Sequence, residues 1–147
     1  MSALKRMHRP FALALALTLL PGAQAADPKG PFTVLEASRP LFEGVSNSDM
    51  AMADACRQWS LSPKQVERFF QLGELLDGVV LHHQFYWLPC SIEGRLHDGA
   101  GQVWSFRING AATATTWRGD GPTREEYRWG CRRQGCEDLV LMAAEAD

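Results

Sequence analysis

Four cysteines are the residues with the clearest chemistry of their own in this 147-residue chain. Cys131 and Cys136 are spaced C-x4-C, whereas Cys56 and Cys90 stand alone in the sequence. No C-x2-C pair occurs, and an even number of cysteines without that spacing favours disulfides over a zinc site. We expect the bonds Cys131–Cys136 and, by remainder, Cys56–Cys90. A bond from Cys90 to the C-terminal part of the chain stays open as an alternative.

Three histidines are the next candidates for chemistry. His82 and His83 are adjacent, and either could bind a metal ion together with His97 and an acid from elsewhere. On a strand, adjacent side chains point to opposite faces, so His82 and His83 would not share one ion. Ordinary surface or core roles are the competing interpretation. We expect no cofactor, and keep a small enzyme or metal-binding protein using these histidines as the second alternative function.

Sequence patterns of known catalytic sites are missing. The chain lacks G-x-S-x-G, the phosphate loop, H-E-x-x-H and the signatures around catalytic cysteines. The carboxylate pairs Glu125-Glu126 and Glu137-Asp138 are sequence neighbours whose side chains alternate between faces, unlike the pair in a glycosidase. We therefore predict a non-enzymatic protein with no catalytic residue.

Tryptophan and arginine are the better candidates for a binding role, because both residue types are favoured anchors of protein interfaces. The chain has five tryptophans, and four arginines cluster around one of them near the predicted last hairpin. A solvated face is the alternative interpretation. The candidate partner-binding residues are Arg124, Arg128, Trp129, Arg132 and Arg133.

The N-terminal segment has the pattern of a secretory signal peptide. Basic residues precede the apolar run Phe11–Leu20, and residues 23–25 form an A-x-A cleavage site. A membrane-spanning helix needs about 20 apolar residues, so we expect cleavage before Ala26 and no stable membrane insertion. A signal peptide over 1–25 implies a periplasmic or secreted protein, and that oxidising destination agrees with disulfides.

Composition indicates one globular domain. Hydrophobic residues make up 46% and charged residues 22% of the chain, which is typical of a folded protein. Residues 1–25 hold three cations and no anion, so residues 26–147 carry a formal charge of −5. Such a charge disfavours nucleic acid as a partner. We expect a single mature domain over 26–147, with residues 26–31 as a mobile lead-in.

Helices are predicted in the first half of the domain. After a short strand at 32–36 and a loop, a helix is expected over 50–59. Ser62, Pro63 and Gln65 form a capping box with proline at the first helical position. This second helix is predicted from Pro63 to about Leu76, with Asp77-Gly78 ending it.

Alternation of apolar and polar residues predicts strands in the second half. Residues 79–87 alternate, and the pattern is sharper over a three-stranded meander at 90–117. A three-residue loop at 99–101 places Leu96 opposite Trp104, with both apolar sets on one face. Asn109-Gly110 predicts a type I′ turn that pairs Ile108 with Ala111, Phe106 with Thr113 and Trp104 with Thr115.

A C-terminal hairpin is predicted from strands at 125–131 and 136–142. Its register stays open. If Cys131 pairs with Cys136, Trp129 lies opposite Asp138; otherwise Trp129 lies opposite Leu139.

The predicted architecture is α+β, with two N-terminal helices packed on one face of an antiparallel sheet of four to six strands built from hairpins. The helix carrying Phe69 and Phe70 is expected to cover the core face. The core residues of that face are Ile92, Leu96, Trp104, Phe106 and Ile108.

Three stretches of the chain carry a resemblance: Trp87-x-Pro89-Cys90-x-Ile92-x-Gly94, then Arg107-x-Asn109-Gly110-x-x-Thr113, then Cys131 and Cys136. The chain resembles small exported bacterial proteins of unknown function that have a W-x-P-C-x-[IV]-x-G strand followed by a glycine-rich hairpin. The resemblance covers about residues 62–136. It implies a periplasmic location and an α+β build, and implies no activity.

Together these patterns predict a small exported interaction protein of the periplasm whose partner is another protein. An inhibitor or immunity-type protein that neutralises a cell-wall-directed toxin or hydrolase is the first alternative.

Overall fold

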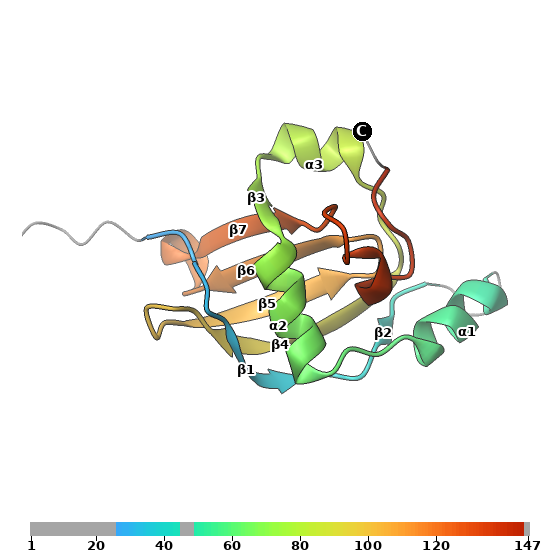
Figure 1. The fold of residues 1–147 in the computed structure, drawn as a ribbon, viewed down its shortest axis with the longest axis horizontal. Coiled ribbons are helices and arrows are strands. Elements are labelled where there is room, and N and C mark those ends of the chain that lie inside the picture. Colours follow the sequence, from blue (N-terminus) through green and yellow to red (C-terminus); the bar gives the residue numbers. More distant parts are fainter. Residues whose placement is uncertain (1–25, 45–48, 146–147) are drawn as a thin grey trace, which may run out of the picture.

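The computed structural model describes residues 26–44 and 49–145 (Figure 1). The predicted signal peptide at 1–25 lies outside the described residues. The strands are β1 (Thr33–Ala37), β2 (Leu41–Phe42), β3 (Glu74–Leu76), β4 (Cys90–His97), β5 (Val103–Asn109), β6 (Thr113–Arg118) and β7 (Glu125–Gly130). The helices are α1 (Met50–Gln58), α2 (Pro63–Leu72) and α3 (Gly78–Gln84), with 3-10 turns η1 (Gly121–Thr123) and η2 (Glu137–Leu139).

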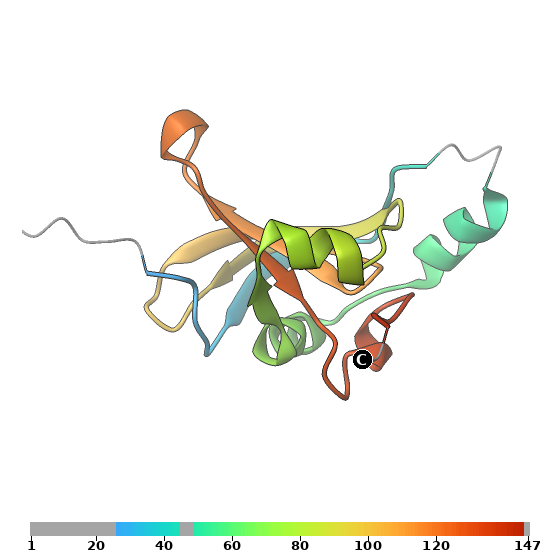
Figure 2. The same ribbon diagram turned by 90° about the horizontal axis from the view of Figure 1, so that it is seen from above.

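The strands form one antiparallel sheet in the order β1-β4-β5-β6-β7-β3, and β2 also pairs with β4. The fold is therefore α+β, and the sheet has seven strands where four to six were expected. Helix α2 crosses one face of the sheet, whereas α1 lies beside β2 at one end (Figure 1). Figure 2 shows α3 lying across the β7 side of the sheet. No helix in the described part of the chain is long and apolar enough to span a membrane.

The first turn of the meander is as predicted. Leu96 lies opposite Trp104, and Ile92 lies opposite Ile108. Gly101 occupies the left-handed region with φ of 77°, as a three-residue hairpin loop requires. These four paired side chains are fully buried on the core face.

The predicted second turn is wrong. Asn109 pairs with Thr113 and Ile108 with Ala114, so the loop has three residues and its left-handed residue is Ala112, with φ of 67°. The cause is the Asn109 side chain: its Oδ1 accepts hydrogen bonds from the backbone N–H groups of Leu88 and Ala111, both at 3.0 Å. The Asn109 side chain therefore binds the backbone of Leu88, which is distant in sequence, as well as the backbone of its own turn.

This change of register exchanges the two faces of β6. A shift by an odd number of residues moves every side chain to the opposite face of a strand. Consequently Ala114 and Thr116 are buried in the core, whereas Thr113 and Thr115 were predicted there. Thr116 Oγ1 accepts a hydrogen bond of 3.0 Å from Trp129 Nε1.

Helix α2 begins as predicted and ends earlier. Ser62 and Gln65 form both hydrogen bonds of the capping box. The helix ends at Leu72, because Gly73 adopts an extended conformation, and residues 74–76 then pair with β7 as strand β3. The prediction that the helix runs to about Leu76 is therefore wrong.

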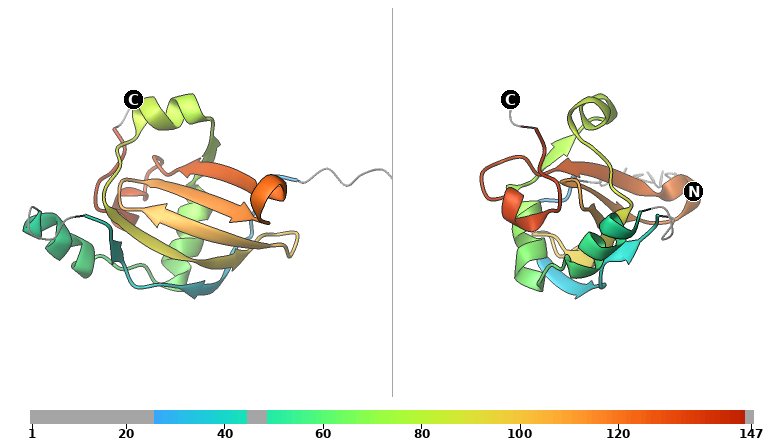
Figure 3. Two further views of the ribbon diagram at one scale, coloured as in Figure 1. Left: turned by 180° about the vertical axis from the view of Figure 1, so that it is seen from behind. Right: turned by 90° about the vertical axis from the view of Figure 1, so that its right-hand side faces the viewer.

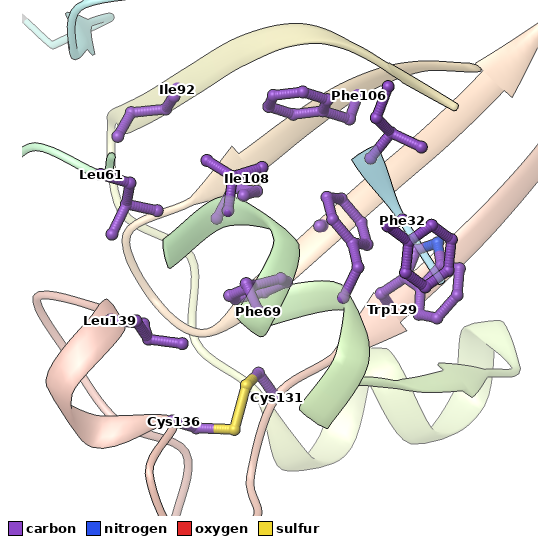
Figure 4. Close-up of a cluster of buried hydrophobic side chains, with 14 of the residues drawn as sticks. Phe32, Leu61, Phe69, Ile92, Phe106, Ile108, Trp129, Cys131, Cys136 and Leu139 are labelled. Atoms are coloured by element: carbon purple, nitrogen blue, oxygen red, sulfur yellow. A yellow bond between two sulfur atoms is a disulfide. The ribbon is translucent and has the colours of Figure 1, made fainter. Parts of the chain in front are cut away.

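Aromatic rings hold α2 against the sheet (Figure 4). The ring of Phe70 lies 5.4 Å from Trp129, 5.7 Å from Phe106 and 5.7 Å from Phe32, measured between centroids. The pairs with Trp129 and Phe106 are edge-to-face, and the pair with Phe32 is tilted at 51°; edge-to-face pairs at such distances are favourable beyond their buried area. Helix α2 and the core face thus form one apolar cluster.

Both predicted disulfides are present. Cys56–Cys90 links α1 to β4, and Cys131–Cys136 closes a loop after β7. The predicted C-terminal hairpin is wrong, because β7 is already paired on both sides, with β6 and β3. Trp129 accordingly lies opposite Ala114 and Leu75, so neither proposed register occurs.

Residues 26–31, expected as a mobile lead-in, pack on the β4–β5 loop. Pro28 is buried, and Gly99 N–H donates a 2.6 Å hydrogen bond to the Lys29 carbonyl. Burial, with a smaller contribution from the Asp27 carboxylate, raises the pKa of Tyr127.

The next segment, β1, is fixed by a side chain of α2: Glu67 Oε1 accepts a hydrogen bond of 3.1 Å from Val34 N–H.

Glu67 gives the protein an acid-sensitive contact. The Lys64 ammonium, which donates a 2.7 Å hydrogen bond, and the Val34 N–H lower the pKa of Glu67. Because the folded-state pKa lies below the unfolded one, this contribution is present above about pH 4.3 and is lost as the pH falls further. We expect Glu67→Gln to reduce the acid-induced loss of stability and to cost under ~1 kcal/mol at pH 7. Urea unfolding at pH 7 and pH 3 measures both, and an unchanged pH dependence would contradict the assignment.

Candidate functional site

Residues 78–84 form helix α3 where a strand over 79–87 was predicted. The Asp77 carboxylate accepts hydrogen bonds of 2.9 Å from the N–H groups of Val79 and Val80, so Asp77 caps the start of a new helix. Asp77-Gly78 had been interpreted as the end of the preceding helix. On α3 the rings of His82 and His83 lie 5.5 Å apart, so the strand argument for opposite faces does not apply.

A groove of about 510 Å³ lies between α3 and the face of the sheet that points away from α2. We call it the α3 groove. One wall is α3, the second is the segment that runs from α3 to β4 beside the sheet (Figure 3), and β6 and β7 contribute the floor. Its lining residues are Gly78, Leu81, His82, Phe85, Tyr86, Trp87, Thr113 and Arg128.

The segment between α3 and β4 is fixed at both ends. The ring of Phe85 packs against Gly130, where an added Cβ would lie 2.3 Å from Phe85 Cζ. At the other end the Asn109 side chain pairs with the Leu88 backbone: Nδ2 donates to the Leu88 carbonyl at 2.6 Å, and Oδ1 accepts from Leu88 N–H. The Asn109 side-chain amide thus makes the two hydrogen bonds to Leu88 that the backbone of a neighbouring strand would otherwise make. Tyr86 and Trp87 lie between these two anchors.

Two aromatic side chains between the anchors are exposed. Trp87 is 66% exposed and Tyr86 is 52% exposed. The Tyr86 hydroxyl donates a hydrogen bond to Glu145, and that bond, together with the carboxylate charge, raises the pKa of Tyr86. The lining therefore combines an aromatic rim with a guanidinium, since Arg128 projects from β7.

The five arginine and tryptophan candidates differ in their surroundings and in their exposure. Trp129, a partner-binding candidate, is only 4% exposed and belongs to the core cluster. Arg124 lies over the Trp117 ring at 5.0 Å and pairs with Glu126 at 2.8 Å. Arg128 lines the α3 groove.

The last two candidates lie on the loop after β7. Arg132 pairs with Glu74 at 2.5 Å and donates a hydrogen bond to Gln84, which connects this loop to β3 and α3. Arg133 is exposed. A partner-binding role for these two arginines stays a prediction.

The structure separates the histidine candidates into two places. His82 and His83 lie on α3, whereas His97 ends β4 and pairs with Thr33 and Val103. Within residues 26–44 and 49–145, no group of three or more histidine, cysteine, aspartate or glutamate side chains is placed to hold a metal ion.

Tyr86 and Trp87 are the residues that sequence reasoning missed as a site. Trp87 entered as one of the five tryptophans and as part of the W-x-P-C pattern, and the predicted strand over 79–87 would have placed the two side chains on opposite faces. The available signal was three consecutive aromatic residues, Phe85-Tyr86-Trp87, just before Leu88-Pro89, because proline restricts the residue before it and ends regular structure.

Comparison of the chain with protein-family models, with curated proteins and with solved structures finds no match.

Proposed function

We propose that the chain is an exported, non-enzymatic interaction protein that binds a partner protein in the α3 groove. The signal-peptide pattern and two disulfides support the exported part of this proposal. An inhibitor or immunity-type role is a narrower form of the same binding function, and the identity of the captured partner would decide it.

The observation that carries the proposal is the exposure of Tyr86 and Trp87 at the rim of the groove. Other tryptophans of this chain, Trp59, Trp104 and Trp129, are buried. Tryptophan, tyrosine and arginine are the residue types that contribute most to protein–protein binding. Because the rim segment is anchored before binding, little conformational entropy is lost when a partner docks.

Binding is also favoured over catalysis by the arrangement of the lining side chains. Nucleophilic catalysis needs a nucleophile and a base within hydrogen-bond reach of each other. The polar lining residues are His82, Tyr86, Thr113 and Arg128, and the structure records no hydrogen bond among the side chains of these four described residues.

Trp87→Ala tests the proposal. We expect the purified variant to lose the proteins that the wild type captures from periplasm after crosslinking, identified by mass spectrometry. Its free energy of unfolding should change by no more than ~0.5 kcal/mol, because the side chain is mostly solvent-exposed. Val103→Ala is the matched control, since Val103 is an exposed apolar residue at the start of β5. Equal capture by the Trp87 variant and the wild type would contradict the proposal.

A further inference from the structure

We infer that the α3 groove binds a partner segment that presents an acidic side chain next to an apolar one. The inference rests on the proposed function and specifies its ligand chemistry. It follows from a partly uncompensated cation in the floor of the groove and from the apolar side chains beside that cation.

Arg128 is the cation. Its one ion pair among the described residues is to Glu126, at 3.8 Å, which is long for a charge-assisted hydrogen bond. The other oxygen of the same carboxylate accepts a 2.8 Å hydrogen bond from Arg124. One carboxylate therefore serves two guanidinium groups, and about one positive charge is left at this place.

The other arginines on the same face of the sheet are better compensated. Arg107 pairs with both Glu93 and Glu43, and Arg95 donates to Glu36 at 2.6 Å. Arg128 is thus the arginine whose fork of N–H donors is available to a second carboxylate. Residues 26–147 carry a net negative charge overall, so an acidic partner would be attracted to this place and repelled elsewhere.

The apolar side chains next to Arg128 define the second half of the ligand. Leu81, Phe85 and Trp87 line the groove together with Arg128. A volume of about 510 Å³ accommodates a few side chains of a partner segment. An acidic residue contacting Arg128 would place its neighbour against this apolar wall, and the desolvation provided by that neighbour would strengthen the ion pair.

The test uses a phage-displayed library of random heptapeptides, selected on wild-type protein recovered from the periplasm after expression of the full chain. Parallel selections use Arg128→Gln and, as the matched control, Arg107→Gln, which removes an arginine outside the groove. We expect aspartate or glutamate beside an aromatic or aliphatic residue to be enriched on the wild type and on the control. The Arg128 variant should not enrich this pair.

Titration calorimetry with one selected peptide gives the second measurement. Arg128→Gln, and separately replacement of the peptide's acidic residue by its amide, should each weaken binding about tenfold. The two changes together should weaken binding little further, because they remove the same contact. Arg128→Lys should restore part of the affinity.

Other outcomes would overturn the inference. These are enrichment of peptides without an acidic residue, no enrichment at all, and a concentration-dependent dimer that Trp87→Ala abolishes. The proposed function fails separately, when Trp87→Ala still captures the partner. Loss of that capture combined with peptides lacking an acidic residue would leave the groove as a binding site and reject only its ligand chemistry.

Discussion

Trp104→Ala is expected to lower the free energy of unfolding by about 3–5 kcal/mol, a large fraction of the ~5–15 kcal/mol of a small domain. The side chain is fully buried on the core face, and its indole packs edge-to-face on Tyr127 at 5.5 Å. Its Nε1 donates a 2.9 Å hydrogen bond to Asp98 Oδ2. Alanine would therefore leave a cavity and also a buried carboxylate oxygen without its donor.

Urea unfolding followed by far-ultraviolet circular dichroism measures this loss. Trp104→Phe separates its two parts, because phenylalanine retains most of the ring volume and removes the donor. We expect this variant to cost about 1–3 kcal/mol. A Trp104→Ala protein within ~0.5 kcal/mol of the wild type would contradict the placement of Trp104 in the core.

Removing the Cys56–Cys90 bond by changing both residues to alanine is expected to cost about 4 kcal/mol, while removing Cys131–Cys136 should cost about 2 kcal/mol. The difference follows from sequence separation, which is 34 for the first bond and 5 for the second. A longer closed loop restricts the unfolded chain more strongly, and this entropy accounts for the expected stabilisation.

The two double variants serve as controls for each other, because both remove a buried pair of sulfur atoms. Urea unfolding of both under the same conditions gives the comparison. Equal losses, or a larger loss for the Cys131–Cys136 variant, would show that native packing around the sulfurs outweighs the loop entropy.

Sequence patterns predicted strand register correctly where a local turn preference agreed with an independent side-chain pattern. The β4–β5 hairpin combined a side-chain pattern with a glycine at the required position, and its register was correct. The Asn109-Gly110 turn rested on local preference alone. There a long-range partner, the Leu88 backbone, engages the asparagine and changes the register.

The C-terminal hairpin failed for a related reason. The pairing of β7 with β3 joins segments about 50 residues apart, and local sequence patterns do not predict such a long-range pairing. The candidate site was predicted only in part for the same cause: Arg128 was identified, but the groove exists because α3 and the segment after it lie against the sheet. Asp77 was identified as a helix boundary, but it caps the start of α3 and does not end the preceding helix.

The two edge strands of the sheet, β1 and β3, affect whether separate molecules can associate edge to edge at high concentration. On one side, the Val34 N–H of β1 is already occupied by Glu67, so an incoming chain finds this backbone donor unavailable. On the other side, β3 has only three residues and the chain then enters α3. Long open edges are the templates on which sheets of separate molecules join into polymers. The occupied donor on β1 and the shortness of β3 therefore reduce the number of backbone groups that the two edges offer to another molecule.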